Sequence, residues 1–262
     1  MPGLEKYPKK SLGQHFLVDK NICVKIVNSL DLQPKDVLLE IGPGQGALTR
    51  VIAESKLQWY IGLEKDRELI PFLKKEFLNF DFVNVDATNF CWSKLNQVQN
   101  LKLVGNLPYN VASLLLWDVL SSLSSYDVAV FMVQKEVAQR IVAAPGSKVY
   151  GALSVWLQSF SCPQLLFHVS PKVFFPEPKV WSSVLLFRPR ADRAIVPKDK
   201  LSYVLKIFFQ HRRKQIQKIL KTYLNQKDKD LFTRLNIDPT FRPENLTVSD
   251  YWKLANYLFS WQ

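Results

Sequence analysis

Residues 37–46, Val-Leu-Leu-Glu-Ile-Gly-Pro-Gly-Gln-Gly, decide the fold. The apolar run Val37–Ile41 predicts a buried strand, and Ala47–Glu54 after the turn predicts a helix. Glycines between the two elements let the backbone approach a ligand closely, and the helix N-terminus behind them carries partial positive charge. The spacing is Gly-x-Gly-x-Gly and not the Gly-x-Gly-x-x-Gly of dinucleotide-binding proteins. The stretch therefore predicts a strand–turn–helix unit that approaches a ligand without a pyrophosphate cradle.

Acidic residues end the next two predicted strands. The strand Trp59–Leu63 ends in Glu64, which lies 64 − 44 = 20 residues after Gly44. A carboxylate at that place can accept hydrogen bonds from both ribose hydroxyls of a nucleoside. The strand Phe82–Val85 ends in Asp86, which is placed to accept from an adenine amine. Together with the glycine turn these acids predict an S-adenosylmethionine site, and a purely structural glycine turn is the alternative.

Residues 105–110, Gly-Asn-Leu-Pro-Tyr-Asn, lie between a predicted strand and a predicted helix, Val111–Leu120. They are expected at the carboxyl end of a strand, where open α/β sheets bind ligands. Asn106 offers an amide oxygen, Pro108 lacks an N–H that would compete for nearby carbonyls, and Tyr109 offers a flat face for a base. Two acceptors beside an aromatic ring suit an exocyclic amine, so this stretch is the expected catalytic loop. The alternative is a proline-containing turn with a packed tyrosine.

The rest of the first two thirds of the chain continues the α/β pattern. Further strands are expected at Leu101–Val104, Val128–Gln134, Leu165–Val169 and Ser183–Phe187, and further helices at Lys135–Val142 and Tyr150–Phe160. Alternating strands and helices imply a mainly parallel sheet with helices on both faces. Pro171–Lys179 is expected to be a loop, in which an aromatic residue, Phe174 or Phe175, could close over a flipped base opposite Tyr109. The alternative for this loop is a hydrophobic plug over the sheet edge.

The composition shifts to basic residues after a charged connector, Pro189–Lys200, and Leu201–Gln262 is predicted to be helical. We therefore expect two domains, residues 1–190 and 191–262. The whole chain carries 35 Lys and Arg against 23 Asp and Glu, a net charge of +12. Residues 188–221 hold 11 Lys or Arg and 2 Asp, which is 11 − 2 = +9 of that charge. Such a footprint is typical of a nucleic-acid-binding surface, although a solvated helix face is the alternative. The residues expected to bind RNA phosphates are Arg212, Arg213, Lys214, Lys218 and Lys221.

No metal site, secretion signal or membrane segment is indicated. Cys23, Cys91 and Cys162 are far apart and fit the reduced core thiols of a cytosolic protein. The N-terminus lacks the apolar stretch of a signal peptide, and no apolar run approaches membrane-spanning length. A cytoplasmic protein that uses no metal and contacts no membrane is therefore expected.

These motifs together closely resemble the ribosomal RNA adenine dimethyltransferases, and within them the bacterial branch that acts on small-subunit rRNA. The resemblance runs from about Lys9 to Leu258. It rests on Gly13-Gln14-His15-Phe16-Leu17, Glu40-Ile41-Gly42-Pro43-Gly44, Glu64, Asp86-Ala87, Gly105 to Asn110, Gln134-Lys135-Glu136-Val137, Tyr150-Gly151, Leu153-Ser154-Val155, Phe174-x-Pro176-x-Pro178-Lys179-Val180-x-Ser182, Arg212-Arg213-Lys214 and Arg242-Pro243-Glu244-Asn245-Leu246. Leu12 departs from the family's usual aromatic residue, and Phe175 and Trp181 occupy variable positions of the pattern.

The resemblance implies a Rossmann-like α/β fold of seven strands, the last antiparallel, with a small all-helical C-terminal domain. It also implies cofactor contacts from specific residues. With the turn glycine that the sequence pattern itself indicates, these are His15, Leu17, Gly42, Gly44, Glu64, Asp86 and Asn106. The implied cofactor is S-adenosylmethionine, and the implied partner is small-subunit rRNA in an immature small ribosomal subunit. A monomer is expected.

The implied reaction transfers two methyl groups to each of two adjacent adenosines in a hairpin near the 3′ end of that rRNA. A hairpin loop presents bases that cost little to extrude. Because the sulfonium leaves as a neutral thioether, no acid catalyst is required and catalysis should be mostly positioning. Asn106 and the carbonyl of Leu107 or Pro108 would hold the amine, while Tyr109 and Phe174 would sandwich the adenine.

Two other classes remain open at this point. One is a non-catalytic RNA-binding or ribosome-assembly factor that keeps the fold and the cofactor pocket. The other is a relative that methylates large-subunit rRNA and confers antibiotic resistance. The loop Phe174–Val180 and the segment Arg242–Leu246 favour the small-subunit branch.

Overall fold

The protein is described by a computed structural model that covers residues 8–9, 12–191, 197–223 and 230–258. Its contacts divide the chain into two compact units. The first consists of residues 1–138 and 162–189, and the second of residues 139–161 and 190–262. The change at residue 190 falls where the sequence predicts a domain boundary. Residues 139–161, however, group with the C-terminal helices, so the two-domain division at 190 stays a prediction.

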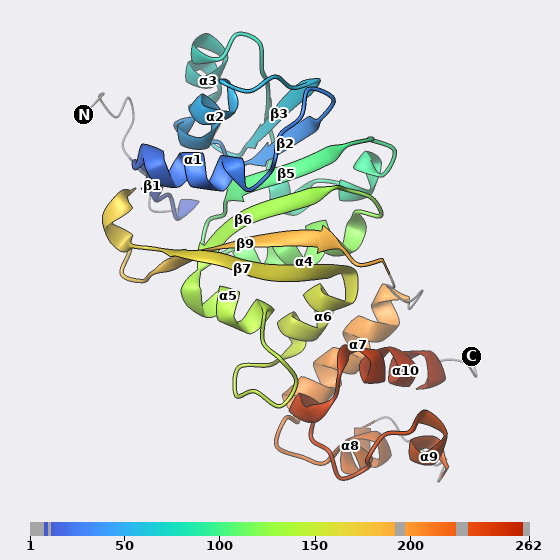
Figure 1. The fold of residues 1–262 in the computed structure, drawn as a ribbon. Helices are drawn as coiled ribbons and strands as arrows, with labels where there is room; N and C mark the ends of the chain where they lie inside the picture. The colour runs from blue at the N-terminus through green and yellow to red at the C-terminus, as the bar shows by residue number, and fades with distance from the viewer. Residues whose placement is uncertain (1–7, 10–11, 192–196, 224–229, 259–262) are drawn as a thin grey trace. The chain divides into compact units, whose positions relative to one another are not determined.

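The first unit is built on a seven-stranded sheet, coloured from blue to orange in Figure 1. In spatial order its strands are β4 (Asp81–Asn84), β3 (Trp59–Glu64), β2 (Val37–Ile41), β5 (Leu101–Asn106), β6 (Val128–Gln134), β9 (Ser182–Pro189) and β7 (Ser161–Val169). The strands from β4 to β6 are mutually parallel, and β9 runs antiparallel to β6. The predicted α/β fold with seven strands and an antiparallel final strand is confirmed. The chain order reverses between β2 and β5, which is the place where such sheets open a ligand crevice.

Helices cover both faces of this sheet, with α1 in front of it and α4 behind it in Figure 1. The helices of the unit are α1 (Lys20–Asn28), α2 (Ala47–Ile52), α3 (Ile70–Glu76), α4 (Ala112–Ser122) and the start of α5 (Lys135–Ile141), with short 3-10 turns at Ala87–Asn89 and Trp92–Leu95. Asp19 caps the N-terminus of α1, because its side chain accepts from the amide of Ile22.

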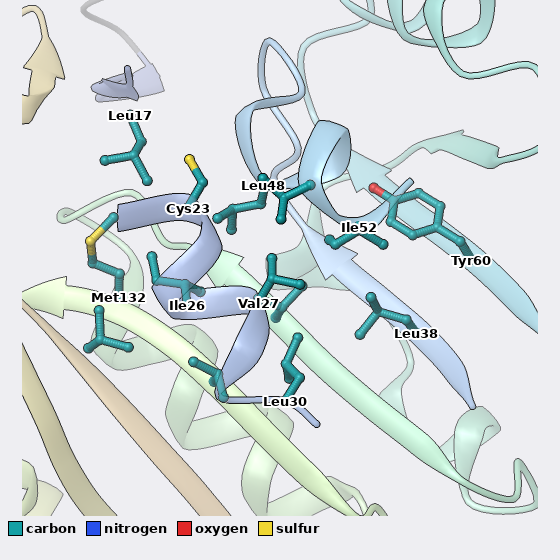
Figure 2. Close-up of a cluster of buried hydrophobic side chains, with 14 of the residues drawn as sticks. Leu17, Cys23, Ile26, Val27, Leu30, Leu38, Leu48, Ile52, Tyr60 and Met132 are labelled. Carbon is teal, nitrogen blue, oxygen red and sulfur yellow. The ribbon is translucent and has the colours of Figure 1, made fainter. Parts of the chain in front are cut away.

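One core cluster fills the space between α1, α2 and the sheet (Figure 2). Alternate strand residues point into it, because successive side chains of a strand face opposite sides. Figure 2 shows Cys23, Ile26 and Val27 of α1 packed near Leu48 of α2 and Leu38 of β2. Burial of this apolar surface is the main force that holds the helices against the sheet.

A second, two-stranded sheet ties the N-terminal segment to the predicted loop. Strand β1 (Phe16–Leu17) pairs antiparallel with β8 (Phe174–Phe175), with Leu17 opposite Phe174. The prediction that Pro171–Lys179 is all loop is therefore wrong for its first five residues, because a 3-10 turn at Pro171–Val173 leads into β8. The partner strand is far away in the sequence, so local patterns do not show this pairing.

The second unit is helical. Its helices are α6 (Ala152–Phe160), α7 (Lys198–Gln210), α8 (Ile216–Tyr223), α9 (Leu231–Leu235) and α10 (Val248–Leu258), with a 3-10 turn at Pro243–Asn245. Thr247 and Asp250 form a capping box at the start of α10, since the Asp250 amide donates to the Thr247 side chain and the Thr247 amide donates to the Asp250 side chain. Helices occupy only part of the predicted all-helical stretch. Residues 211–215 and 236–242 are among those that connect them.

Among the described residues, no helix combines the length and apolarity needed to cross a membrane. Within the same residues, no cluster of three His, Cys, Asp or Glu side chains could hold a metal ion. All three cysteines are free thiols, but only Cys23 is buried. The expectation of three core thiols is therefore wrong for Cys91 and Cys162, which are exposed.

Candidate functional site

A pocket opens at the carboxyl ends of β2, β3 and β5, where the strand order reverses. It has a volume of about 140 Å³ and belongs wholly to the first unit. Its lining comes from Leu12–Leu17, Glu40–Gln45, Ala47, Leu48, Leu63–Lys65, Val85–Thr88, Asn106–Val111 and Leu115. All the predicted cofactor-contacting residues and four of the five predicted catalytic residues therefore lie around one cavity. Phe174 is the exception.

The glycine turn after β2 forms one wall of the pocket. Gly42, Gly44 and Gly46 have φ angles of 70°, 58° and 77°, in the left-handed region that favours glycine. A Cβ at Gly44 would also approach the Phe16 ring to 3.1 Å. The turn therefore needs glycine for its backbone shape and leaves that wall open to a ligand.

Glu64 is buried at the end of β3, with only 5% of its surface exposed. Its Oε2 accepts from the Gly44 amide at 2.9 Å, and its Oε1 accepts from the Asp66 amide at 2.7 Å. Burial raises the pKa of Glu64 above its ordinary value of 4.5, although these two hydrogen bonds act in the opposite direction. Both oxygens are thus oriented by the backbone, and each retains acceptor capacity for a ligand hydroxyl.

Asp86 lies on the same cavity with both carboxylate oxygens engaged. Its Oδ2 pairs with the Lys65 ammonium at 2.8 Å, and its Oδ1 accepts from the amide and hydroxyl of Thr88. These partners, Lys65 first, hold the pKa of Asp86 below its ordinary value. The side chain is therefore an ionised acceptor, as the predicted contact with an adenine amine requires.

Asn106 is oriented by its own donor group. Its Nδ2 donates to the His15 carbonyl at 3.0 Å. With the amide nitrogen held by that bond, Oδ1 is the end of the side chain that can accept from a ligand amine. The sequence supplies the asparagine, but the partner that selects its orientation comes from the N-terminal segment.

The backbone hydrogen bonds of the loop differ between the Leu107 and Pro108 carbonyls, the two candidates for holding the substrate amine. The Pro108 carbonyl accepts from the amides of Val111 and Ala112, at 3.1 and 3.0 Å, and so begins α4. The Leu107 amide donates to the Met132 carbonyl at 3.1 Å, and this bond fixes the peptide that joins Asn106 to Leu107. Of the two carbonyls that the sequence leaves open, the Leu107 carbonyl is the one that helix α4 does not occupy.

Tyr109 is held by two groups that the sequence analysis did not connect with it. Its hydroxyl lies 2.6 Å from the Ser182 hydroxyl at the start of β9. Its ring stacks on His15, with centroids 5.5 Å apart and an interplanar angle of 24°. The Nδ1–H of His15 in turn donates to the Pro176 carbonyl at 2.7 Å. His15 therefore links the catalytic loop with the segment that follows β8.

Phe174 is not brought to Tyr109 in this structure. It pairs with Leu17 in the small sheet, packs into the α1 core cluster and is only 4% exposed. Its neighbour Phe175 points outward and is 41% exposed. Strand alternation explains the difference, because adjacent residues of β8 must face opposite sides. The expected sandwich of Tyr109 and Phe174 thus stays a prediction, with Phe174 in the core position here.

Two further polar side chains line the cavity, Glu40, which is buried, and Gln14, which is partly exposed. Glu40 is 1% exposed, and its Oε2 accepts from the Thr49 hydroxyl at 2.8 Å and from the Tyr60 hydroxyl. Gln14 donates to Asp66 at 3.3 Å, and Lys9 donates to the same carboxylate at 2.9 Å. The second contact ties the N-terminal segment to the loop after β3. The motifs that contain Glu40 and Gln14 were the available signal.

The predicted RNA-binding residues fall into two groups in the second unit. Arg212 donates through Nε to the Glu244 carboxylate and through Nη2 to the Lys148 carbonyl at 2.6 Å. The other four line a concave surface, which we call the basic groove. It consists of Arg213, Lys214, Gln215, Lys218, Lys221, Thr222, Thr240 and Arg242. Arg242 joins it because the Ile216 amide donates to the Phe241 carbonyl, a contact that sequence reasoning missed.

Residues 6–259 of the chain match the model of a protein family that is described as ribosomal RNA adenine dimethylase. This chain belongs to the ribosomal RNA adenine dimethylase family. The ribosomal RNA small subunit methyltransferase A of Nitratidesulfovibrio vulgaris (strain DP4) is 47% identical over 255 residues, which cover 94% of this chain and 95% of that protein. The family resemblance inferred from the motifs is confirmed, and so is the class of enzyme.

Solved structures agree with this assignment. A dimethyladenosine transferase from Plasmodium falciparum matches with a TM-score of 0.81 and 25% identity, over 92% of this chain and 96% of that one. The 23S rRNA methyltransferase ErmE matches with a TM-score of 0.68 and 22% identity, over 93% of this chain and 99% of that one. At 22% identity, the second match shows only that the two proteins share a fold.

Glu40 gives this adenine dimethylase a testable pH dependence of stability. Burial raises its pKa from 4.5 to about 7, against the lowering effect of the Tyr60 and Thr49 hydrogen bonds. Between these two values the unfolded chain loses the Glu40 proton while the folded chain keeps it. Stability therefore falls as the pH rises through that window, with no contribution from Glu40 below it and a constant penalty above it. Glu40→Gln should remove this component.

Urea unfolding of the wild type and of Glu40→Gln at a series of pH values measures the effect. The difference in unfolding free energy between the two should change between pH 4.5 and about 7 and level off outside that range. The exposed Glu177→Gln is the matched control and should follow the wild type. Parallel curves for the wild type and Glu40→Gln would contradict the assignment.

Proposed function

We propose that this chain uses S-adenosylmethionine to dimethylate the exocyclic amines of two adjacent adenosines in a hairpin near the 3′ end of small-subunit rRNA. The observation that carries the proposal is the hydrogen bond from Asn106 Nδ2 to the His15 carbonyl. Because this bond holds the amide nitrogen, the Asn106 Oδ1 is left to accept from the amine of a substrate base in the pocket. Family membership and the small-subunit name of the 47% identical relative support the choice of substrate.

The pocket fits the proposed cofactor. Glu64, buried and oriented by two backbone amides, suits a pair of ribose hydroxyls, and the Gly42–Gly44 turn leaves room for close approach. Asp86 is the acceptor proposed for the adenine amine, and His15 and Leu17 also line the cavity. When bound, the cofactor supplies an electrophilic methyl group on a sulfonium that departs as a neutral thioether.

The residues of this chain act on the adenosine amine by position. For the first methyl transfer we assign its two N–H groups to the Asn106 Oδ1 and to the Leu107 carbonyl, because the Pro108 carbonyl already caps α4. The proton that the nitrogen loses on methylation passes to solvent, and the one remaining N–H binds one of these acceptors in the second transfer. Both acceptors are neutral and fixed by the backbone, so they hold the nitrogen lone pair in one direction and need no reorganisation during transfer. The Tyr109 ring, fixed by Ser182, offers the stacking face for the base.

The basic groove is the proposed contact for rRNA phosphates. Arg213, Lys214, Lys218, Lys221 and Arg242 line it, and none of the groove residues is acidic. Such a surface binds the phosphate backbone without reading sequence, so it would dock the enzyme and leave selection to the catalytic pocket. A cytoplasmic location and a monomeric state remain part of the proposal.

The competing classes are less well supported. A non-catalytic assembly factor would not need the orientation of Asn106 or the anchored Tyr109 ring. For a large-subunit enzyme, the likeness is 22% identity to the 23S rRNA methyltransferase, against 47% to the small-subunit relative.

Asn106→Ala separates catalysis from binding. The variant should bind unmethylated small subunits almost as the wild type does, since the amide acts mainly in the transition state. Methyl transfer at saturating S-adenosylmethionine should fall by about two or more orders of magnitude, as misplacing a reacting group does. Incorporation of labelled methyl groups into small subunits is the measurement. The exposed Asn28→Ala serves as control, and near-normal transfer by Asn106→Ala would refute the catalytic role.

Arg212 and Arg213 are neighbours with different expected roles. Arg213→Ala should weaken binding to small subunits and lower the slope of log affinity against log salt by about 0.7–0.9, the value for one phosphate contact. Arg212→Ala should leave that slope unchanged and lower the unfolding midpoint, because Glu244 and the Lys148 carbonyl lose their partner. Equal losses of salt slope in the two variants would contradict this division.

A further inference from the structure

Trp181 is a large exposed aromatic residue that directly precedes β9. Half of its surface, 50%, is accessible to solvent, and it does not line the cofactor pocket. The next residue, Ser182, holds the Tyr109 hydroxyl at 2.6 Å. Trp181 is therefore one residue away from the group that fixes the base-stacking ring of the catalytic loop.

The strand register places Trp181 at the same end of the sheet as Asn106, where the parallel strands β5 and β6 end. Asn106 ends β5 opposite Met132 of β6, and β6 continues to Gln134 opposite Ser182 of the antiparallel β9. The Lys135 amide donates to the Trp181 carbonyl at 2.8 Å, which extends this pairing one step further. Backbone hydrogen bonds thus hold Trp181 in place beyond the carboxyl ends of β5 and β6.

The ammonium group of Lys135 lies close to the exposed ring of Trp181. The Lys135 ammonium lies 6.0 Å from the centroid of the Trp181 ring, at the outer limit of a cation–π contact. A base can therefore displace it at little cost, and the ammonium then remains near the phosphate of the stacked nucleotide. Val180 and Phe175, 42% and 41% exposed, add apolar surface in the same segment. An exposed aromatic face beside a lysine is the combination that binds unpaired nucleotides.

We propose that Trp181, with Lys135 beside it, is a stacking platform for the unpaired adenosine adjacent to the one in the catalytic pocket. This inference rests on the proposed function. Extruding one adenosine into the pocket removes a stacking partner from its neighbour, and the Trp181 indole replaces that partner. Since both adenosines of the pair are substrates, the platform holds the second one near the pocket while the first is methylated.

The variant Trp181→Ala tests the platform on unmethylated small subunits as substrate. Loss of one stacked base should raise the KM for subunits about tenfold, within the roughly 5- to 150-fold range that stacking energies imply, with kcat unchanged. The increase should not depend on salt, because stacking releases no counterions. Mass spectrometry of the rRNA should show subunits with only one of the two adenosines methylated. Trp181→Phe should keep most of the wild-type behaviour.

Trp59 provides a matched control in the same unit. It is also 50% exposed, but it lies at the amino end of β3, away from the carboxyl strand ends that form the pocket, and its Nε1 donates to Asp81. Trp59→Ala should leave the KM for subunits unchanged. A KM for Trp181→Ala within twofold of wild type, or an equal increase in Trp59→Ala, would overturn the platform. Absence of methyl transfer by the wild-type protein would instead overturn the proposed function.

Discussion

The hydrogen bond between Asn106 Nδ2 and the His15 carbonyl is the contact on which the site depends. It can form only if two distant segments meet. Strand β5 must pass close to β2 as far as its carboxyl end at the pocket. Gly105 permits this, because a Cβ there would lie 2.7 Å from the Ile41 carbonyl oxygen. The N-terminal segment must cross the pocket, and its pairing with β8 and the Lys9–Asp66 ion pair hold it there. Selecting one orientation of one amide thus requires contacts from much of the first unit.

Glu64, Asn106 and the peptide of Leu107 are positioned by backbone groups, whereas Asp86 is held by the Lys65 ammonium and Thr88. Amides of Gly44 and Asp66 orient Glu64, and a carbonyl orients Asn106. The Met132 carbonyl fixes the peptide of Leu107. Backbone groups of strands and tight turns move little, so acceptors held by them stay aligned without further cost. This is what methyl transfer needs when the leaving group is neutral and no proton has to be supplied.

The sequence was sufficient for the strands of the seven-stranded sheet, the glycine turn and the residues that gather around the pocket, because periodicity and strand-end positions are local signals. It was insufficient wherever the decisive partner is remote. The burial of Phe174 follows from its pairing with Leu17, and the ion pair of Arg212 follows from Glu244. The choice between the Leu107 and Pro108 carbonyls depends on how α4 begins. Residue types could be predicted, whereas the orientation of each group required the three-dimensional contacts.

A crystal structure of the protein with S-adenosylhomocysteine and a short RNA containing the two adjacent adenosines would test the central claim directly. The account predicts that the exocyclic nitrogen of one adenosine lies within hydrogen-bond distance, about 2.7–3.2 Å, of both the Asn106 Oδ1 and the Leu107 carbonyl. The bond from Asn106 Nδ2 to the His15 carbonyl should persist in that complex. An amine bound to the Pro108 carbonyl, or an Asn106 amide flipped so that its nitrogen faces the base, would contradict it.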